Sequence, residues 1–323
     1  MNYDVLAIGE LLIDFTTDHT QADGYPVMAA HPGGAPANFL APLAKYGKKT
    51  ALLACVGDDA FGHLLCNTVR DIGISTTGVS VTREAFTTMA FVTLDSNGER
   101  EFSFARKPGA DTLLKADTDS YSLVDQTAVI HFGTVGMTNE PSRASHRMLV
   151  EYAKKAGKLV SFDPNLREPL WGDLAEAKKQ MLWGIAQTDV LKISDTEAKL
   201  LYGLDPEKSA KEILANNPVQ LVFVTCGKDG CYFSNRTVSG YVPSLQNICV
   251  TDTTGAGDIF GGSAMYGILN SGKSPKDLCE VELFNIVRFA CTTAALSTTK
   301  LGGISSVPEL SEVQRSCVIQ TDI

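Results

Sequence analysis

The sequence predicts an α/β fold with one doubly wound, mostly parallel sheet and helices on both faces. From about residue 120 onward, short apolar runs alternate with helix-like stretches, which is the pattern of βαβ units. The runs are too continuously apolar to face water on one side, as expected for strands covered on both faces. One segment of alternating polar and apolar residues interrupts this pattern. The 323 residues therefore predict a single large domain, 1–323, with a small β lid.

The strands and helices follow from local composition. The first apolar run, Val5 to Ile8, has acidic residues around it and no basic segment before it, so it indicates a strand and not a signal peptide. The helix-like stretch from Ser142 to Ala156 ends at Gly157, a common stop signal, and a second helix is expected from Leu174 to Ala186. The remaining strand-like runs are Ala51 to Val56, Ala128 to His131, Leu159 to Phe162, Val190 to Ile193, Leu221 to Val224 and Ile248 to Val250.

The segment from Thr87 to Phe104 alternates apolar and polar residues on both sides of Asp95-Ser96-Asn97-Gly98, which predicts a β-hairpin with a glycine-containing turn. A hairpin of this kind does not fit inside a parallel layer. We expect it to form a small sheet outside the core with Leu12 to Thr16, so that about 12–16 and 87–106 cover a bound ligand as a lid. Because an uncovered small sheet exposes apolar surface, we also expect a homodimer.

Composition and charge argue against several classes of function. The net charge of −9 disfavours binding to nucleic acid or to an anionic membrane, because both need a basic face. We find no run of about 18 apolar residues that would predict a transmembrane helix. The eight cysteines show no CxxC spacing and the five histidines no HExxH pair, so we expect free thiols in a reducing cytoplasm and no zinc site.

The segment Asp252-Thr-Thr-Gly-Ala-Gly-Asp258 carries the clearest chemical signal. It precedes a helix-like run, Ile259 to Leu269, and its two glycines allow backbone N–H groups to converge at the helix N-terminus, where an anion is favoured. A well-capped helix would show the same local pattern, since an acid also suits a first helical turn. Phe260 stands where a dinucleotide-binding motif needs its third glycine. The segment therefore predicts a phosphate site or a capped helix, but not a dinucleotide site.

A second phosphate-site pattern lies in the wrong context. Residues 267–274, GILNSGKS, satisfy the P-loop pattern GxxxxGK[ST]. A P-loop must follow a strand and open a helix, whereas this pattern begins near the end of a helix-like run, and Asn270 to Gly272 indicates its stop. Ser274 and Pro275 then favour the start of the next helix. We expect Lys273 to lie in a solvated turn.

Taken with other motifs, DTTGAGD resembles the signature of the ribokinase-like carbohydrate kinases, the pfkB family. The N-terminal motif Gly33-Gly-Ala-Pro-Ala-Asn38 is followed by Gly47 and Gly57, and the resemblance covers nearly the whole chain. Arg106-Lys-Pro-Gly-Ala-Asp111 and Asp163-Pro-Asn-Leu-Arg167, with Leu170-Trp171 after it, are similar to the fructokinase branch. The resemblance implies a ribokinase-like fold and an ATP-dependent kinase that phosphorylates the 6-hydroxyl of D-fructose.

The resemblance also implies the catalytic residues. A sugar hydroxyl is a poor nucleophile, so the reaction needs a carboxylate that accepts its proton and donors that hold charge on the transferred phosphoryl group. Asp258 matches the base of the family, and the N–H groups of Gly255, Ala256 and Gly257 match its anion hole.

Sugar contacts are implied at positions that supply hydrogen bonds to hydroxyl groups. Asp14 is either such a contact or a surface acid, and Arg106 and Arg167 are either contacts or ordinary solvated arginines. The implied set is Asp14, Gly34, Asn38, Phe104, Arg106, Asn165 and Arg167. Leu40 departs from the family, which usually has a small residue there.

The segment from Val224 to Gly230, VTCGKDG, resembles the nucleotide loop of the family, although a plain strand–turn–strand would use the same residues. Glycine permits the close approach of a phosphate or ribose to the backbone. The implied ATP contacts are Lys192, Thr225, Gly227, Gly230, Gly257 and Asn285.

Two cations are implied beside ATP. The Mg²⁺ motif of the family, Asn-x-x-Glu, is present as Ser194-Asp-Thr-Glu197, so Glu197 is implied to hold Mg²⁺ through water while the amide is replaced by a hydroxyl. A monovalent cation such as K⁺ is implied at Asp252 and Thr254 together with Ser306 of the segment STTKLGGISS, because oxygen ligands suit a hard cation.

Two alternatives stay open. A kinase of the same family that acts on 2-keto-3-deoxygluconate or another small sugar could use Arg106 and Arg167 for a carboxylate. A non-catalytic sugar- or nucleotide-binding protein could keep the same fold, since fold alone does not guarantee chemistry.

Overall fold

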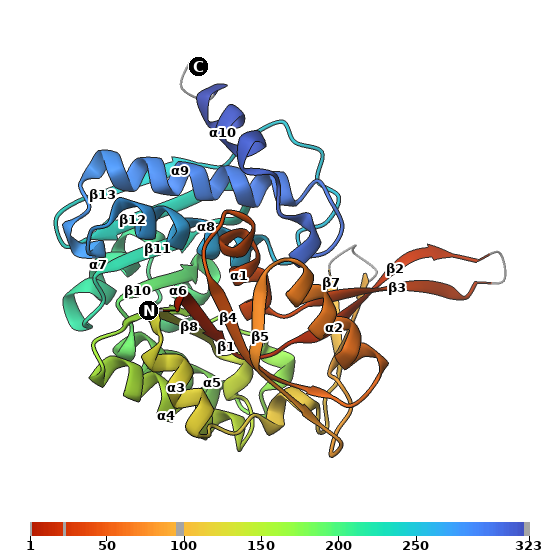
Figure 1. Ribbon diagram of the computed structural model, residues 1–323. Coiled ribbons are helices and arrows are strands. Elements are labelled where there is room, and N and C mark those ends of the chain that lie inside the picture. The colour runs from red at the N-terminus through yellow and green to blue at the C-terminus, as the bar shows by residue number, and fades with distance from the viewer. Residues whose placement is uncertain (1, 22–23, 95–99, 320–323) are drawn as a thin grey trace.

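A computed structural model of the chain describes residues 2–21, 24–94 and 100–319. Its main feature is a nine-stranded sheet with the strand order β13-β12-β11-β10-β9-β8-β1-β4-β5 (Figure 1). The strand pairs from β11 to β5 are parallel, whereas β12 runs antiparallel to both β11 and β13. The predicted mostly parallel sheet with helices on both faces is therefore confirmed.

The large sheet and its helices alternate along the chain. The strands are β1 (Tyr3–Ile8), β4 (Thr50–Gly57), β5 (Ile74–Thr82), β8 (Thr127–Gly133), β9 (Leu159–Asp163), β10 (Val190–Ser194), β11 (Leu221–Thr225), β12 (Gly230–Asn235) and β13 (Ser239–Pro243). The helices are α1 (Ala35–Lys45), α2 (Ala60–Asp71), α3 (Thr118–Asp125), α4 (Ser142–Lys155), α5 (Leu174–Gln187), α6 (Asp195–Tyr202), α7 (Pro206–Asn216), α8 (Ala256–Ser271), α9 (Glu280–Ser297) and α10 (Leu310–Ile319).

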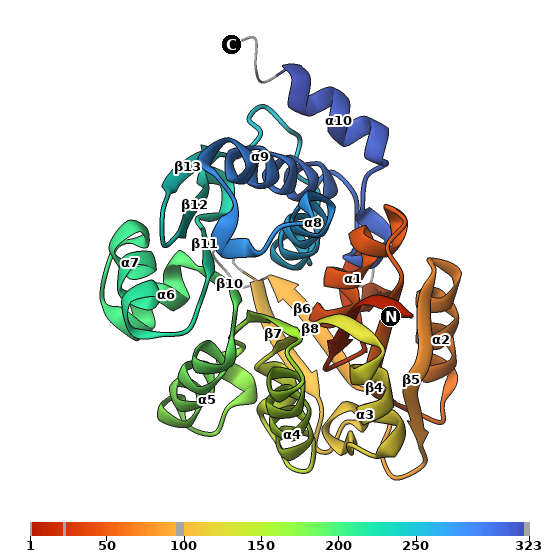
Figure 2. The same ribbon diagram turned by 60° about the vertical axis from the view of Figure 1, so that its left-hand side comes forward.

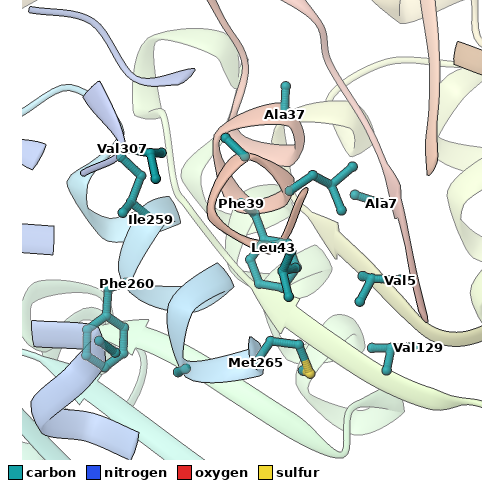
Figure 3. Packing of buried hydrophobic residues seen from close by; sticks show 14 of the residues in the cluster. Val5, Ala7, Ala37, Phe39, Leu43, Val129, Ile259, Phe260, Met265 and Val307 are labelled. Atoms are coloured by element: carbon teal, nitrogen blue, oxygen red, sulfur yellow. The ribbon is translucent and has the colours of Figure 1, made fainter. Parts of the chain in front are cut away.

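Alternate residues of each central strand fill two apolar cores. Val5 and Ala7 of β1 belong to the core beneath α1, α8 and α9, which Figure 3 shows around Phe39. Leu6 and Ile8 point the other way, into the core beneath α4, α5 and α7. Figure 2 shows the two helical layers on either side of the sheet. This two-residue alternation with burial on both faces explains why the strands appear as continuous apolar runs in the sequence.

A separate four-stranded sheet has the order β3-β2-β6-β7, and its β2–β3 arm projects from the body of the molecule (Figure 1). It comprises β2 (Leu12–Thr20), β3 (Pro26–Gly33), β6 (Met89–Leu94) and β7 (Arg100–Ala105). The predicted small sheet from Leu12 to Thr16 and the hairpin is confirmed, while the predicted turn from Asp95 to Gly98 lies outside the described residues. β3 was not predicted, because its strand-forming signal depends on its partner β2.

One predicted strand is wrong. Ile248 to Val250 forms no strand in the structure and lies in an irregular segment that leads to α8. Val250 is 55% exposed, so burial in a sheet does not stabilise this short apolar run. Two antiparallel strands that the sequence analysis missed, β12 and β13, complete the edge of the sheet instead.

The P-loop-like segment has the predicted helix-end conformation. Gly272 adopts a left-handed conformation at the C-terminus of α8, and Ser274 precedes a short 3₁₀ turn, Pro275–Asp277. The Lys273 ammonium lies 2.7 Å from a carboxylate oxygen of Glu282 and is half exposed. No strand precedes the segment, so it lacks the geometry of a P-loop.

The order of the strands determines where a ligand can bind. β1 lies between β4 and β8, and the chain leaves it in opposite directions along the sheet, first to β4 and β5 and later to β8 and beyond. In open α/β sheets, ligands bind outside the carboxyl ends of strands at such a reversal point. Glu10 follows β1, Asn165 follows β9 and Ser194 ends β10, so polar residues from three strands converge at this edge.

Candidate active site

The turn before α8 is shaped by Gly255. This residue has a φ of 73° and is the N-cap of the helix. A Cβ at this position would lie 2.9 Å from Nδ2 of Asn38 and 3.0 Å from Cα of Gly303, so a larger residue would strain the turn in two ways. The backbone N–H groups that follow belong to the first helical turn, where the helix dipole favours negative charge. The structure thus places a helix N-terminus at the predicted position.

Asp258 lies in this first turn and is 8% exposed. Asn38 Nδ2 of α1 donates a 3.0 Å hydrogen bond to Oδ2, and Asn165 Nδ2 donates one of 3.0 Å to Oδ1. Burial raises the pKa of the Asp258 carboxyl, while the hydrogen bond from Asn38, the charges of Lys192 and Arg167 and the hydrogen bond from Asn165 oppose this rise. The result is a fixed, buried carboxyl group that is suited to accept a proton.

Lys192 brings a cation to the same turn. Its Nζ donates a 2.9 Å hydrogen bond to Oδ2 of Asp163, and a Cβ built on Gly257 would lie 3.0 Å from Nζ. Burial alone would lower the pKa of the Lys192 ammonium, but the carboxyl groups of Asp163, Glu197 and Asp258 raise it. A charged lysine therefore lies against the helix terminus.

A cavity of about 130 Å³ opens beside Asp258. Its walls come from the end of β1, the start of α1, the small sheet, the loop after β9 and the turn before α8. The small sheet contributes Asp14 and Phe104, so it forms part of the wall. The predicted residues among those that line the cavity are Asp14, Gly34, Asn38, Phe104, Asn165, Arg167, Thr254, Gly255 and Asp258.

Arg106 is not among the residues that line this cavity. Its guanidinium is buried, with Nε 2.9 Å from Oδ2 of Asp111, Nη1 2.6 Å from Oγ1 of Thr138 and Nη2 3.0 Å from the carbonyl oxygen of Val135. Asp111 also accepts a hydrogen bond from the Thr88 hydroxyl. Because Thr88 precedes β6 and Arg106 follows β7, these contacts fasten the base of the small sheet to the main body.

A second cavity of about 460 Å³ lies on the other side of the turn before α8. Four predicted ATP contacts line it: Thr225, Gly227, Gly230 and Gly257. Sequence reasoning missed most of its apolar wall, which comes from the 244–250 segment, Phe260 and small residues of α9. The apolar run from Ile248 to Val250, directly before the 252–258 segment, was the available signal in the sequence. Asn285 does not line this cavity; it is exposed on α9 and accepts a 3.0 Å hydrogen bond from Arg288.

Glu197 and Ser194 form a capping box at the start of α6. Oε2 of Glu197 accepts hydrogen bonds from the backbone N–H and the hydroxyl of Ser194, at 2.9 and 2.8 Å. Oε1 accepts a 2.7 Å hydrogen bond from the N–H of Leu166, next to Asn165. Ser194 thus supports the carboxylate of Glu197, and this carboxylate in turn fixes the loop that carries Asn165 and Arg167.

Asp252 joins the turn before α8 to the 297–306 segment. Oδ1 accepts hydrogen bonds from the N–H and hydroxyl of Thr254, at 2.9 and 2.7 Å, and Oδ2 accepts one of 2.9 Å from the N–H of Gly302. Ser306 is buried, and its hydroxyl donates to the carbonyl oxygen of Gly303 at 2.8 Å. The two predicted halves of the cation site are therefore adjacent. Among the described residues, no cluster of three or more His, Cys, Asp and Glu residues could hold a metal ion.

Comparison with known proteins connects this geometry to a family. A sequence model described as pfkB family carbohydrate kinase matches residues 2–310. Fructokinase-1 of Zea mays is 40% identical over 312 residues, covering 96% of each chain. Fructokinase-2 of Solanum lycopersicum is 38% identical over 314 residues, covering 95% of this chain and 94% of the relative.

Solved structures give the same result. The structure of a fructokinase with bound ATP from Xylella fastidiosa superposes with a TM-score of 0.89 at 29% identity, covering 99% of this chain and 100% of that one. A fructokinase from Vibrio cholerae O395 in a form with bound fructose, ADP and calcium ion has a TM-score of 0.84 at 27% identity, covering 98% and 100%. Within the described parts of the chain, none of the helices combines the length and hydropathy needed to cross a bilayer.

Proposed function

Because the chain belongs to the pfkB family of carbohydrate kinases, we propose that it is an ATP-dependent fructokinase that converts D-fructose to fructose 6-phosphate and gives ADP. One observation carries this proposal: the turn before α8 lies between the two cavities. Asp258 lines the smaller cavity, Ala256 and Gly257 line the larger one, and Thr253 lines both. A sugar hydroxyl in the first cavity and the terminal phosphate of ATP in the second would meet at this turn.

Asp258 is the proposed general base. Its carboxylate faces the smaller cavity, and the amides of Asn38 and Asn165 hold one oxygen each. This arrangement fixes the carboxylate for a proton from the 6-hydroxyl as that oxygen attacks phosphorus. The raised pKa of Asp258 makes it a stronger base than an exposed aspartate would be.

The negative charge that develops on the phosphoryl group is balanced by the same turn. We propose that the N–H groups of Gly255, Ala256 and Gly257 donate to its oxygens, since they belong to a helix N-terminus. Lys192 adds a positive charge next to Gly257. These groups are fixed before the substrates arrive, which lowers the cost of reorganisation during transfer.

The residues around Glu197 suit Mg²⁺ bound through water. A third cavity, lined by Asn165, Lys192, Ser194 and Glu197 among others, lies next to the catalytic turn. Each carboxylate oxygen has two lone pairs, so Glu197 can accept hydrogen bonds from metal-bound water while it keeps its contact to Leu166. Bound Mg²⁺ would neutralise charge on the ATP phosphates. For the monovalent cation, Asp252, Thr254 and Ser306 supply the oxygen-rich surroundings that K⁺ prefers.

Charge in the smaller cavity favours a neutral sugar over a sugar acid. Glu10, Asp14 and Asp258 supply three carboxyl groups to its lining, and Arg167 supplies one guanidinium. Arg106, the second cation that a carboxylate substrate would need, is paired with Asp111 outside the lining. Like charges in a poorly solvated site disfavour an anionic ligand. This balance supports fructose over 2-keto-3-deoxygluconate.

A coupled assay for ADP release with a panel of sugars tests the proposal. We expect fructose to give a higher kcat/KM than ribose, adenosine or 2-keto-3-deoxygluconate, and a higher value for any of these three would contradict the assignment. The same assay without Mg²⁺, or with Na⁺ in place of K⁺, tests the two cations. Loss of turnover without Mg²⁺ and slower turnover in Na⁺ are the expected results.

We also propose that residues 1–323 form one kinase domain in which the small sheet, about 12–16 and 87–106, closes over the sugar as a lid. Phe104 and Asp14 already belong to the cavity wall, which supports this role. Hydrogen exchange in β2, β6 and β7 should slow when fructose binds, because closure protects their backbone N–H groups. Unchanged exchange at saturating fructose would argue against a lid.

Two exposed apolar side chains beside the small sheet support the proposal of a homodimer. Phe86, just before β6, is 76% exposed, and Tyr25, just before β3, is 70% exposed. Phe86 lies at the end of the small sheet where Ile13 pairs with Met89, and Tyr25 lies at the far end of the β2–β3 arm beside the pair Thr20–Pro26. Exposed apolar side chains of this size favour contact with a partner. Sedimentation analysis should give twice the monomer mass, and substitution of Phe86 by Ser should weaken the dimer. We expect the enzyme to act in the cytoplasm, where ATP is available and free cysteines stay reduced.

A further inference from the structure

Glu10 is a carboxyl group in the lining of the smaller cavity that the account above uses only as a charge, with no contact to the substrate. It directly follows Gly9 at the end of β1 and is 4% exposed. Its Oε1 accepts a 2.9 Å hydrogen bond from the N–H of Ala35, the first residue of α1. Glu10 and Ala35 both line the smaller cavity. A buried carboxyl group is costly to hold unless its oxygens have partners, so its presence beside a sugar-sized cavity needs an explanation.

The N-terminus of α1 fixes Glu10 relative to Asp258. Glu10 is bonded to the N–H of Ala35, and Asn38, three residues later, is bonded to Asp258. One helical turn separates these two contacts, which is a distance of about 5 Å along the helix axis. A hexose that places one hydroxyl at Asp258 can therefore reach Glu10 with another part of its ring.

The charges around Glu10 set its protonation. Burial raises the pKa of Glu10 to about 7; the N–H groups of Glu10 and Ala35 oppose this shift, the charge of Asp111 adds to it and that of Arg106 opposes it. A carboxyl group that is partly protonated near neutral pH can both donate and accept a hydrogen bond, as a sugar hydroxyl can. Gly34 packs directly against the backbone of Glu10, where a Cβ would lie 2.4 Å from the Glu10 carbonyl oxygen, so a glycine at this position allows α1 to begin next to Glu10.

We propose that Glu10 is a specificity-determining sugar contact that hydrogen bonds a hydroxyl on the side of the fructose ring opposite to the reacting C6. The inference rests on the proposed function, because it assumes that a sugar occupies the smaller cavity with one hydroxyl at Asp258. In this proposal two carboxyl groups contact the sugar, Asp258 and Glu10, and each is held by a residue in the first turn of α1.

The test compares the parent with Glu10→Ala and Glu10→Gln on fructose and on its 1-deoxy, 3-deoxy and 4-deoxy analogues. In the parent, removal of the hydroxyl that contacts Glu10 should lower kcat/KM by about tenfold, as one lost hydrogen bond would. In Glu10→Ala, the kcat/KM for this same analogue should lie within about twofold of the kcat/KM for fructose, while the KM for ATP stays near that of the parent. Glu10→Gln keeps an acceptor for Ala35 and an N–H donor, so it should recover most of the discrimination.

A structural role alone would give a different pattern. If Glu10 only anchors α1, Glu10→Ala will lower kcat for fructose and for every analogue by the same factor, and the discrimination among analogues will stay as in the parent; this result would overturn the inference. A parent enzyme that discriminates against none of the three analogues would overturn it as well. Failure of the parent to use fructose would instead refute the proposed function, and the two failures are therefore distinguishable.

Discussion

Replacement of Asp258 by Asn should lower kcat with fructose by about 10²–10⁴-fold, the range typical of a lost general base. The amide has nearly the same shape as the carboxylate and can still accept hydrogen bonds, but it cannot take the proton of the 6-hydroxyl. Asn38 and Asn165 each donate to one oxygen of Asp258, so one of these two contacts must change when an NH₂ group replaces an oxygen. Fructose binding, measured by calorimetry, should persist.

Lys273→Ala is the matched control for this variant. Lys273 belongs to the sequence that matches the P-loop pattern, yet its ammonium forms a half-exposed ion pair with Glu282. It lies just after the C-terminus of α8, whereas Asp258 lies in the first turn of this helix. Its kcat should stay within about threefold of the parent, because a change at an exposed surface pair has little effect. Near-normal turnover in the Asp258 variant together with a collapse in the Lys273 variant would refute the proposed mechanism.

Arg106→Met should lower the free energy of unfolding by about 3–5 kcal/mol, as expected when one partner of a buried ion pair is removed. The side chains of Arg106 and Asp111 are 3% and 1% exposed, so the variant leaves a carboxylate buried without its cation. The carbonyl oxygen of Val135 and the hydroxyl of Thr138 lose donors as well or must find new partners. Urea unfolding monitored by circular dichroism measures the effect.

The double variant Arg106→Met with Asp111→Leu separates the charge effect from other causes. It removes both charges, so it should be more stable than Arg106→Met alone, since well-packed apolar residues often replace a buried ion pair at little cost. If Arg106 instead contacts the sugar, the free energy of unfolding of Arg106→Met will equal that of the parent, and its KM for fructose will be higher. This outcome would contradict the assignment of Arg106 to the base of the small sheet.

The large sheet and the turn before α8 could be predicted because each depends on local sequence. The apolar runs of β1, β4, β8, β9, β10 and β11 are continuous, since both faces are covered, and the glycines of the 252–258 segment directly require a tight turn. The turn before α8, the position of Asp258 in its first helical turn and the rejection of the P-loop pattern needed no tertiary information beyond the order of elements.

Other features depend on partners that are distant in the sequence. β3 is a strand because β2 pairs with it, and Ile248 to Val250 forms no strand because it lines a cavity and pairs with no neighbour. Arg106 looked like a site residue in its motif, but Asp111, Thr138 and Val135 hold its side chain. Glu10 had no signal of its own in the sequence, and only the fold brings it into the cavity lining and into contact with Ala35.

The most direct test of the central claim is the position of the new phosphate ester. The purified protein is incubated with ATP, Mg²⁺ and ¹³C-labelled fructose, and the product is examined by ³¹P and ¹³C NMR. Transfer to the hydroxyl held at Asp258 predicts phosphorus coupling at C6 and one ADP for each fructose 6-phosphate formed. Coupling at C1, or release of ADP and inorganic phosphate without a sugar ester, would contradict the account.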